Sequence, residues 1–279
     1  MKVAVTGAGG FVGSHVVDAL ARRDGIEIIA LSRRPLPPER LPGASINLLL
    51  DHEAATEEDY DRIGRPDVLF HFAWNGLPDY RSAHHLETEL PAQFRFLRTM
   101  VASGLPRLLV SGTCYEYGMI GGELTEDCAA PPENAYASAK VELLARLVHL
   151  QSASPFALTW PRVFYLWGPR QAPSSLYTQL SAAVARGDTH FPMSNGDQQR
   201  DYLPVEEAAE LLVRLGLRDG GGGVVNLCSG EPITVLALVE GWLERNGWKI
   251  ELERGRFPVP DFEPHAFWGS TVKLRSLIA

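Results

Sequence analysis

The start of the chain places a glycine-rich turn between an apolar run and a helix-like segment, and this arrangement limits the folds open to the rest. Residues 2–6, KVAVT, form the apolar run, and residues 16–23 carry apolar side chains at helical spacing. Gly7, Gly10 and Gly13 stand three residues apart between the two. The opening therefore predicts a buried strand, a tight turn and a helix.

The glycine turn also has a chemical meaning. Glycine permits positive φ, lets the backbone approach a pyrophosphate, and lets the helix pack close to the sheet. The helix N-terminus then presents free amides to the anion. The string TGAGGFVG departs from the standard G-x-G-x-x-G fingerprint, because Val12 stands where the third glycine would be. It indicates a dinucleotide site, with a packing role for the glycines as the alternative.

The same alternation continues through the first half of the chain. Nearly continuous apolar runs are separated by helix-like segments, which is typical of parallel strands covered by helices on both faces. The sequence thus predicts an α/β fold built on a doubly wound parallel Rossmann sheet. Beyond the first, the predicted strands are residues 26–31, 46–50, 67–73, 107–112 and 156–163.

The pattern changes after about residue 165, where loops rich in glycine, proline and polar residues separate fewer regular segments. The aromatic residues of the last stretch, RFPVPDFEPHAFWGS, would be costly to leave in water. We expect residues 1–165 to form a dinucleotide-binding domain and residues 166–279 a smaller, mainly substrate-binding C-terminal lobe. Parts near residues 197–230 are expected to pack back on the first domain.

Composition excludes several classes of protein. The formal net charge of −8 gives no general attraction for nucleic acid, and no apolar run approaches the length of a membrane span. The N-terminus shows no secretory pattern, so we expect a cytoplasmic protein. Cys114, Cys128 and Cys228 lack metal-like spacing and favour reduced thiols. The histidines have no ligand pattern, and we predict no metal ion.

Four motifs together resemble the extended short-chain dehydrogenase/reductase family, in the branch that acts on nucleotide-activated sugars. TGAGGFVG is similar to its G-x-x-G-x-x-G turn, HFAW to its H-x-A element, SGTCYEYG to its strand end, and YASAK to its Y-x-x-x-K. Similarities at 161–169, 198–209 and 266–273 extend the resemblance over nearly the whole chain. The resemblance implies cofactor contacts from Gly7, Gly9, Gly10, Phe11, Val12, Gly13, Ser32, Arg33, Arg34, Asp51, His71, Phe72, Ala73, Ser111, Tyr136, Lys140, Pro161 and Val163.

The end of the second predicted strand bears on the choice of dinucleotide. NAD-using relatives carry a carboxylate there for the ribose 2′-hydroxyl, whereas this chain has Ser32 followed by Arg33 and Arg34. Arginine can hold a 2′-phosphate through charge-assisted hydrogen bonds. We therefore predict NADP(H), with NAD(H) as the alternative. In the alternative without a ligand role, the two arginines are simply solvated loop residues. Asp51 matches the family's adenine-contacting acid, and Asn47 would take that position in an alternative alignment.

Tyr136 and Lys140 lie one helical turn apart, so an ammonium can sit beside the phenol. Lowering the pKa of a phenol from about 10 to about 7 requires roughly 4 kcal/mol of differential stabilisation. A nearby Lys⁺ and the cofactor's charge are the expected sources. The resemblance implies that Tyr136 is the acid/base and that Lys140 lowers its pKa and binds the ribose hydroxyls of the cofactor. It also implies that Thr113 donates a hydrogen bond to the reacting oxygen.

Some positions depart from the family pattern. Dehydratases carry an Asp-Glu pair after the Thr, and this chain has Cys114 and Tyr115 instead. Elimination therefore lacks its acid and base, and Cys114 is either an acid of its own or a small packed residue. Glu89 and Tyr165 stand about where many relatives have Asn.

The resemblance also implies substrate contacts. An arginine suits a pyrophosphate, and an aromatic ring suits a base or ribose, which are the roles expected of Arg200 and Tyr202. Arg256 is a second candidate arginine, and Ser175 either caps a helix or helps to bind phosphate. The predicted substrate-binding residues are Thr113, Cys114, Tyr115, Tyr165, Ser175, Arg200, Tyr202 and Arg256.

These observations predict an enzyme that uses NADPH to reduce a nucleotide-linked keto-sugar, most plausibly a 4-keto-6-deoxyhexose. A nucleotide-sugar 4-epimerase with retained NAD(P), a reductase of small ketones, and a non-catalytic NADP(H)-binding protein are the alternatives. The family resemblance implies a homodimer formed through the segments near 86–103 and 136–152.

Overall fold

The computed structural model describes residues 1–43, 45–258 and 263–279. Its main sheet has the strand order β12-β8-β5-β4-β1-β2-β3, with the short β6 paired to β8, and its strand pairs are parallel. The predicted doubly wound α/β fold is thereby confirmed. The strands are β1 (Lys2–Thr6), β2 (Glu27–Ser32), β3 (Ser45–Leu49), β4 (Val68–His71), β5 (Arg107–Val110), β6 (Gly112–Thr113), β8 (Ala157–Val163) and β12 (Gly223–Leu227).

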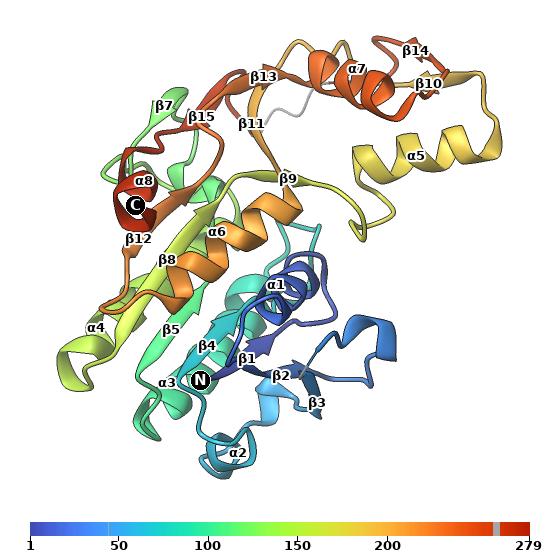
Figure 1. The fold of residues 1–279 in the computed structure, drawn as a ribbon. Helices are drawn as coiled ribbons and strands as arrows, with labels where there is room; N and C mark the ends of the chain where they lie inside the picture. Colours follow the sequence, from blue (N-terminus) through green and yellow to red (C-terminus); the bar gives the residue numbers. More distant parts are fainter. Residues whose placement is uncertain (44, 259–262) are drawn as a thin grey trace.

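Each face of the sheet is covered by helices, because the strands are apolar on both sides (Figure 1). Val3 and Val5 of β1 pack into one core with α1 (Phe11–Ala21), α6 (Val205–Leu217) and α8 (Val272–Ile278). Ala4 faces the other core, with α3 (Leu90–Ala102) and α4 (Ala135–Ala153). Short helical elements lie between: η1 (Pro38–Arg40), η2 (His52–Ala54), α2 (Glu58–Arg62), η3 (His85–Glu89) and η4 (Cys114–Tyr117).

A smaller lobe lies beyond the carboxyl ends of the strands (Figure 1). It contains α5 and α7, and its core includes Leu180, Phe191 and Trp242. β12 is a strand of the main sheet, and α6 packs on one face of that sheet. β11 instead forms a separate three-stranded sheet with β9 and β13. The remaining elements are β7 (Gly122–Leu124), β9 (Tyr165–Trp167), α5 (Leu176–Arg186), β10 (His190–Pro192), β11 (Gln199–Pro204), β13 (Pro232–Thr234), α7 (Val235–Asn246), β14 (Glu251–Glu253) and β15 (Phe267–Gly269).

Within the described ranges, the helices are all too short or too polar to cross a lipid bilayer.

Candidate active site

The glycine turn between β1 and α1 is shaped by close backbone contacts. Gly7 adopts a φ of +66°, and its carbonyl accepts a hydrogen bond from the Gly10 amide at 2.8 Å. A Cβ on Gly13 would lie 2.2 Å from the Gly7 oxygen, so no larger residue fits without movement. Helix α1 begins after Gly10, which has no side chain to cap the first amides. The turn therefore leaves amides open to an anion at the helix N-terminus.

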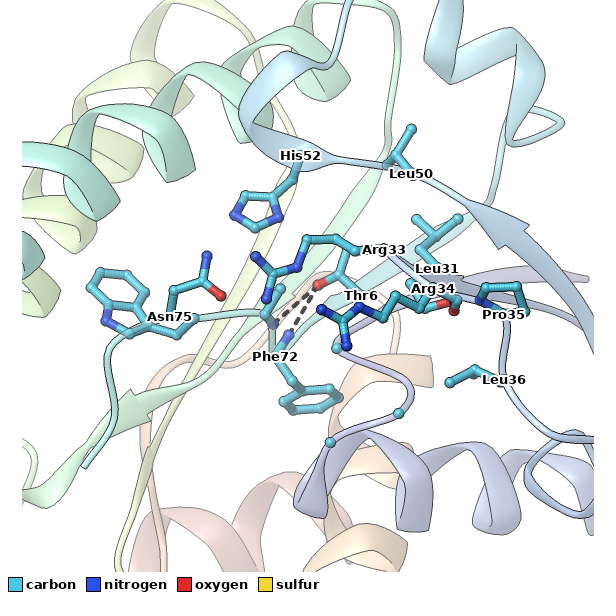
Figure 2. Close-up of a pocket in the computed structure, with 16 residues that line it drawn as sticks. Thr6, Leu31, Arg33, Arg34, Pro35, Leu36, Leu50, His52, Phe72 and Asn75 are labelled. Carbon is cyan, nitrogen blue, oxygen red and sulfur yellow. Dashed lines mark hydrogen bonds between the residues drawn. The ribbon is translucent and has the colours of Figure 1, made fainter. Parts of the chain in front are cut away.

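A cavity of about 680 Å³ opens beside this turn (Figure 2). It lies at the carboxyl ends of β1, β2 and β4, which is where open α/β sheets bind ligands. Its lining is Thr6, Gly7, Gly9, Gly10, Leu31, Ser32, Arg33, Arg34, Pro35, Leu36, Leu50, His52, Phe72, Ala73, Trp74 and Asn75. Eight of the eighteen predicted cofactor-binding residues line it, namely Gly7, Gly9, Gly10, Ser32, Arg33, Arg34, Phe72 and Ala73.

A buried hydrogen-bond chain supports the wall of this cavity. Thr6 Oγ1 lies 2.9 Å from His71 Nδ1 and accepts hydrogen bonds from the amides of Phe72 and Ala73 (Figure 2). His71 Nε2 lies 2.6 Å from Gln93 Oε1, whose amide nitrogen donates to Ala73 O at 3.0 Å. Burial lowers the pKa of His71 well below its ordinary value, so the ring is neutral. His71 therefore positions the Phe72 and Ala73 backbone from behind the cavity wall.

The loop after β2 carries the two arginines into the cavity (Figure 2). The Asn47 amide nitrogen donates to Ser32 Oγ at 2.8 Å, and its oxygen accepts from the Leu36 amide at 2.8 Å. Ser32 Oγ in turn donates to Arg34 O at 2.7 Å. Asn47, the alternative to Asp51 as the adenine-contacting residue, therefore fixes the shape of this loop.

Asp51 lies at the edge of the cavity and is exposed. Its carboxylate accepts a hydrogen bond from the Glu53 amide at 3.1 Å and caps η2. Its neighbours Leu50 and His52 line the cavity. A contact between Asp51 and an adenine stays a prediction.

The three predicted catalytic residues come from two neighbouring elements. Thr113 ends β6, and Tyr136 and Lys140 lie on the first turns of α4, which Asn134 caps by accepting from the Ala137 amide at 2.9 Å. All three catalytic candidates are buried. Lys140 Nζ donates to the carbonyl of Ser111 at 2.8 Å and lies 3.9 Å from the centre of the Trp74 ring.

The electrostatics of this pair differ from the sequence expectation. We expected Lys140 and the charge of a bound cofactor together to lower the pKa of the Tyr136 phenol, and in the protein alone burial raises it. Burial lowers the pKa of Lys140 to about 7, against opposing effects of Glu116 and Glu89. Lys140 Nζ faces an indole and a carbonyl and lies 5.7 Å from the centre of the Tyr136 ring, and burial penalises the charged form of both groups. In this state Tyr136 is a protonated acid.

Because the pKa of Lys140 is about 7 in the folded protein and 10.5 ordinarily, the unfolded state binds more protons between these values. Stability should therefore rise with pH in that window, by up to about 1.4 kcal/mol per unit. We expect urea unfolding to show this rise in the wild type and its loss in Lys140→Met. Parallel pH profiles for the two proteins between pH 7 and 10 would contradict it.

Glu116 is a site residue that the sequence reasoning missed. Its buried carboxylate accepts from the Thr113 amide at 2.8 Å, from Trp160 Nε1 at 3.0 Å and from Arg162 Nε at 2.8 Å. Thr113 Oγ1 accepts from the Tyr115 amide at 3.3 Å, completing a capping box. The signal in the sequence was a charged residue between apolar neighbours in SGTCYEYG. This network fixes the backbone of Thr113.

Several of the predicted substrate residues gather around a second carboxylate, Glu263, whose side chain is 8% exposed. Arg200 donates to it through Nε at 2.9 Å, and Tyr115 OH donates at 2.8 Å. Tyr165 OH lies 3.5 Å from Tyr115 OH, and its ring is 5.4 Å from that of Tyr202. The guanidinium of Arg200 thus has a carboxylate partner already, and a phosphate that used it would have to share or replace Glu263.

The other predicted residues have simpler surroundings. Cys114 is buried, and burial raises the pKa of its thiol, which favours the packing role. Ser175 caps α5 by accepting from the Thr178 amide at 3.3 Å. The exposed Arg256 lies 3.6 Å from Glu253. On β8, Pro161 pairs with Val225 of β12, and Val163 pairs with Thr113 of β6.

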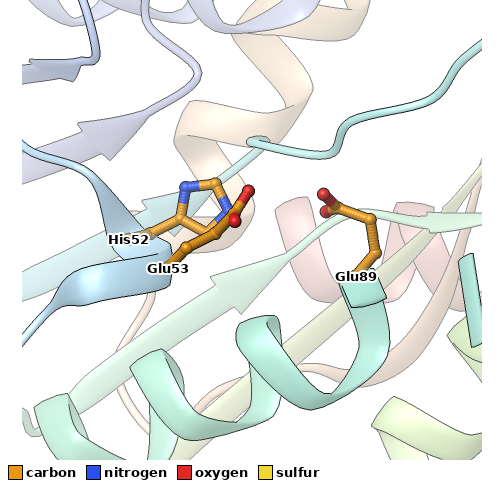
Figure 3. A group of neighbouring side chains, drawn as sticks. All are labelled: His52, Glu53 and Glu89. Atoms are coloured by element: carbon orange, nitrogen blue, oxygen red, sulfur yellow. The ribbon is translucent and has the colours of Figure 1, made fainter. Parts of the chain in front are cut away.

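His52, Glu53 and Glu89 place potential ligand atoms within 4.8 Å of one another (Figure 3). Side-chain amides already form hydrogen bonds with these three residues. Gln93 Nε2 donates to Glu89 at 2.8 Å and lies 3.1 Å from His52 Nε2, and Asn75 Nδ2 donates to Glu53 at 3.2 Å. Burial alone would raise the pKa of Glu89, but these amides lower it overall. We therefore assign no metal to the group.

Comparisons with known proteins give consistent results. A family model described as the NAD dependent epimerase/dehydratase family matches residues 3–228. The dTDP-6-deoxy-L-talose 4-dehydrogenase (NAD(+)) of Aggregatibacter actinomycetemcomitans is 26% identical over 97% of this chain and 100% of its own. A UDP-glucose 4-epimerase of Azospirillum brasilense is 24% identical over 89% of this chain and 78% of its own. The structure of MoeE5 with UDP-glucuronic acid and NAD superimposes with a TM-score of 0.82 at 25% identity, covering 100% of this chain and 92% of that one.

Proposed function

The chain belongs to the NAD-dependent epimerase/dehydratase family, and from this premise we propose that it is an NADP(H)-dependent reductase of a nucleotide-linked 4-keto-6-deoxyhexose. The observation that carries the choice of reduction is the pair of arginines, Arg33 and Arg34, in the cofactor cavity, and the pair of residues after Thr113 argues against elimination. A dehydratase needs a carboxylic acid and a carboxylate there, whereas Cys114 is a neutral thiol and Tyr115 a protonated phenol. The relative that acts as a dTDP-sugar 4-dehydrogenase supports the same position on the sugar, since dehydrogenation and reduction are one reaction in two directions.

The chemistry assigns one task to each residue. Bound NADPH would supply the hydride that reduces the carbonyl carbon to an alcohol. Tyr136 gives its phenolic proton to the carbonyl oxygen as charge develops there, and Thr113 donates a hydrogen bond to the same oxygen. Lys140 stabilises the resulting phenolate and is the expected partner of the ribose hydroxyls. The protonated state of Tyr136 suits the direction of reduction.

A 4-epimerase that oxidises and re-reduces its sugar is the second candidate, favoured by the epimerase among the relatives. The two differ in what happens to the cofactor. A reductase consumes NADPH in proportion to product, and absorbance of the nicotinamide falls. An epimerase turns over with no net change in that absorbance. Assay with dTDP- and UDP-linked 4-keto-6-deoxyhexoses, and with the corresponding 4-hydroxy sugars, separates the two.

The choice of NADPH rests on Arg33 and Arg34, which line the cavity with no acid at Ser32. Each guanidinium can pair with a 2′-phosphate. We expect the wild type to bind NADPH at least about tenfold more tightly than NADH, and an Arg33→Ala, Arg34→Ala double variant to lose this preference. Fluorescence titration measures both constants.

Arg40→Ala is the matched control, because Arg40 lies in η1 of the same region but does not line the cavity. It should keep the preference. Equal binding of the two dinucleotides by the wild type would contradict the assignment, remove the main argument for net reduction, and place the epimerase first.

We also infer a homodimer in which α3 and α4 of two copies pack together. Val141 and Val148 on α4 are 37% and 51% exposed, and Phe94 of α3 forms part of a shallow surface cavity with Arg146 and His149. Two exposed valines on α4, next to the half-buried Phe94 of the adjacent α3, support an interface there.

A further inference from the structure

The cofactor cavity stops short of the catalytic residues. Among the described residues, its lining passes from the glycine turn through Phe72 and Ala73 and ends at Trp74 and Asn75. Ser111, Thr113, Tyr136 and Lys140 do not line it. A dinucleotide that reached Tyr136 would have to extend past the indole of Trp74.

The indole lies directly on the catalytic pair. The Nζ atom of Lys140 is 3.9 Å from the centre of the Trp74 ring, within the range of a cation–π contact. The ring meets that of Tyr136 nearly edge-on, with centroids 5.6 Å apart and an interplanar angle of 78°. Lys140 and Tyr136 are 1% and 8% exposed, so the indole helps to exclude water from both.

A buried histidine holds the indole in this position. Trp74 Nε1 donates to Nδ1 of His85 at 3.0 Å, and His85 Nε2 donates to the carbonyl of Asp79 at 2.8 Å. His85 is fully buried, and its ring also contacts Tyr136 at 5.4 Å. The position of Trp74 is therefore defined by its hydrogen bond to His85, by its ring contacts with His85 and Tyr136, and by the ammonium of Lys140 over its face.

We propose that Trp74 is a cover over the nicotinamide half of the site, which the dinucleotide displaces when it binds. This rests on the proposed function, because it requires a dinucleotide in this cavity. The open cavity would hold the adenosine half, and Lys140 would hold the nicotinamide ribose once the indole of Trp74 has moved aside. The ammonium exchanges an aromatic face for ribose hydroxyls, and the phenol of Tyr136 becomes accessible to substrate only in the loaded enzyme.

The cover has a measurable cost. When only a fraction of the protein has the indole displaced, the apparent Kd of a ligand that needs this state is the intrinsic Kd divided by that fraction. NADPH needs it, whereas 2′,5′-ADP occupies only the open half. Removing the indole should therefore strengthen binding of NADPH and leave that of 2′,5′-ADP unchanged.

We would titrate both ligands by calorimetry into the wild type, Trp74→Ala and Trp74→Phe, with Trp248→Phe in the other lobe as control. In Trp74→Ala the Kd of NADPH should fall by about fivefold or more, with that of 2′,5′-ADP unchanged. Trp74→Phe keeps an aromatic face but loses the hydrogen bond to His85, so its Kd for NADPH should be intermediate. The control should match the wild type.

An NADPH affinity that stays equal or weakens in Trp74→Ala, with 2′,5′-ADP unchanged, would overturn the cover and leave the proposed function standing. A wild type that bound neither ligand would overturn the cofactor assignment and the cover with it. A second readout does not depend on affinity. The fluorescence of Trp74 is the difference in emission between wild type and Trp74→Phe. Acrylamide should quench this fluorescence more strongly when NADP⁺ is bound than in the protein alone, and 2′,5′-ADP should not have this effect.

Discussion

Replacing Tyr136 by Phe should lower kcat by about 100- to 10,000-fold, the usual contribution of a positioned acid. The phenol is the proton donor in the proposed reduction, and phenylalanine has no proton to give in its place. Phe fills nearly the same space among the rings of Trp74, Tyr80 and His85, so the fold should be kept. Steady-state kinetics with NADPH and a 4-keto sugar nucleotide measure the effect, and calorimetry should give an unchanged Kd for NADPH.

Tyr60→Phe is the matched control, because Tyr60 is also buried but lies on α2, with its hydroxyl 3.5 Å from a carbonyl of Pro66. It should keep full activity. A Tyr136→Phe enzyme within about threefold of wild-type kcat would mean that another group delivers the proton, or that chemistry is not rate-limiting. Single-turnover mixing separates these two explanations, because it observes the hydride transfer itself.

The main sheet was predictable because each of its strands can be recognised from its own stretch of sequence. Parallel strands buried on both faces are nearly continuous apolar runs, and the five runs predicted after the first correspond to β2, β3, β4, β5 and β8. Boundaries were less accurate. The run at 67–73 ends as a strand at His71: the Phe72 amide is shared between the Thr6 carbonyl and Thr6 Oγ1, and the Ala73 amide donates to Thr6 Oγ1.

The residues that complete the site were not predictable, because their partners are distant in the sequence. Glu116 and Arg162 are separated by 46 positions, and Arg200 and Glu263 by 63. A motif can place Arg200 at a substrate site, but it gives no indication that a carboxylate already occupies its guanidinium. Trp74 is similar, since only the packing of α4 against the loop after β4 places Lys140 on its ring.

The pKa of Tyr136 illustrates the same limit. Spacing correctly places a lysine one turn away, but burial penalises the charged form of both groups. With the indole in place, Lys140 Nζ lies 5.7 Å from the centre of the Tyr136 ring and donates its hydrogen bond to the Ser111 carbonyl. Bringing the pKa of the phenol toward neutrality therefore requires the rearrangement that cofactor binding would impose, and a pattern of residue types carries no information on that change of state.

Arg162→Met should lower the free energy of unfolding by about 3–5 kcal/mol, the typical cost of leaving a buried charge without its partner. The side chains of Glu116 and Arg162 are 0% and 12% exposed, with Nε 2.8 Å from Oε2. Without the guanidinium, the carboxylate keeps its donors from Thr113 and Trp160 but loses its countercharge. Urea unfolding followed by circular dichroism measures the change.

The double variant Glu116→Gln, Arg162→Met tests the cause, because it removes the buried charge together with its partner. It should recover part of the stability lost in Arg162→Met, since a neutral amide costs far less to bury than a carboxylate. Arg146→Met is the control, because its exposed pair with Glu142 contributes less than about 1 kcal/mol. If Arg162→Met cost no more than Arg146→Met, the buried pair would contribute no more to stability than an exposed one. If the expected loss is found, a low kcat in folded Arg162→Met protein would follow from a displaced Thr113, because the same carboxylate accepts from its amide.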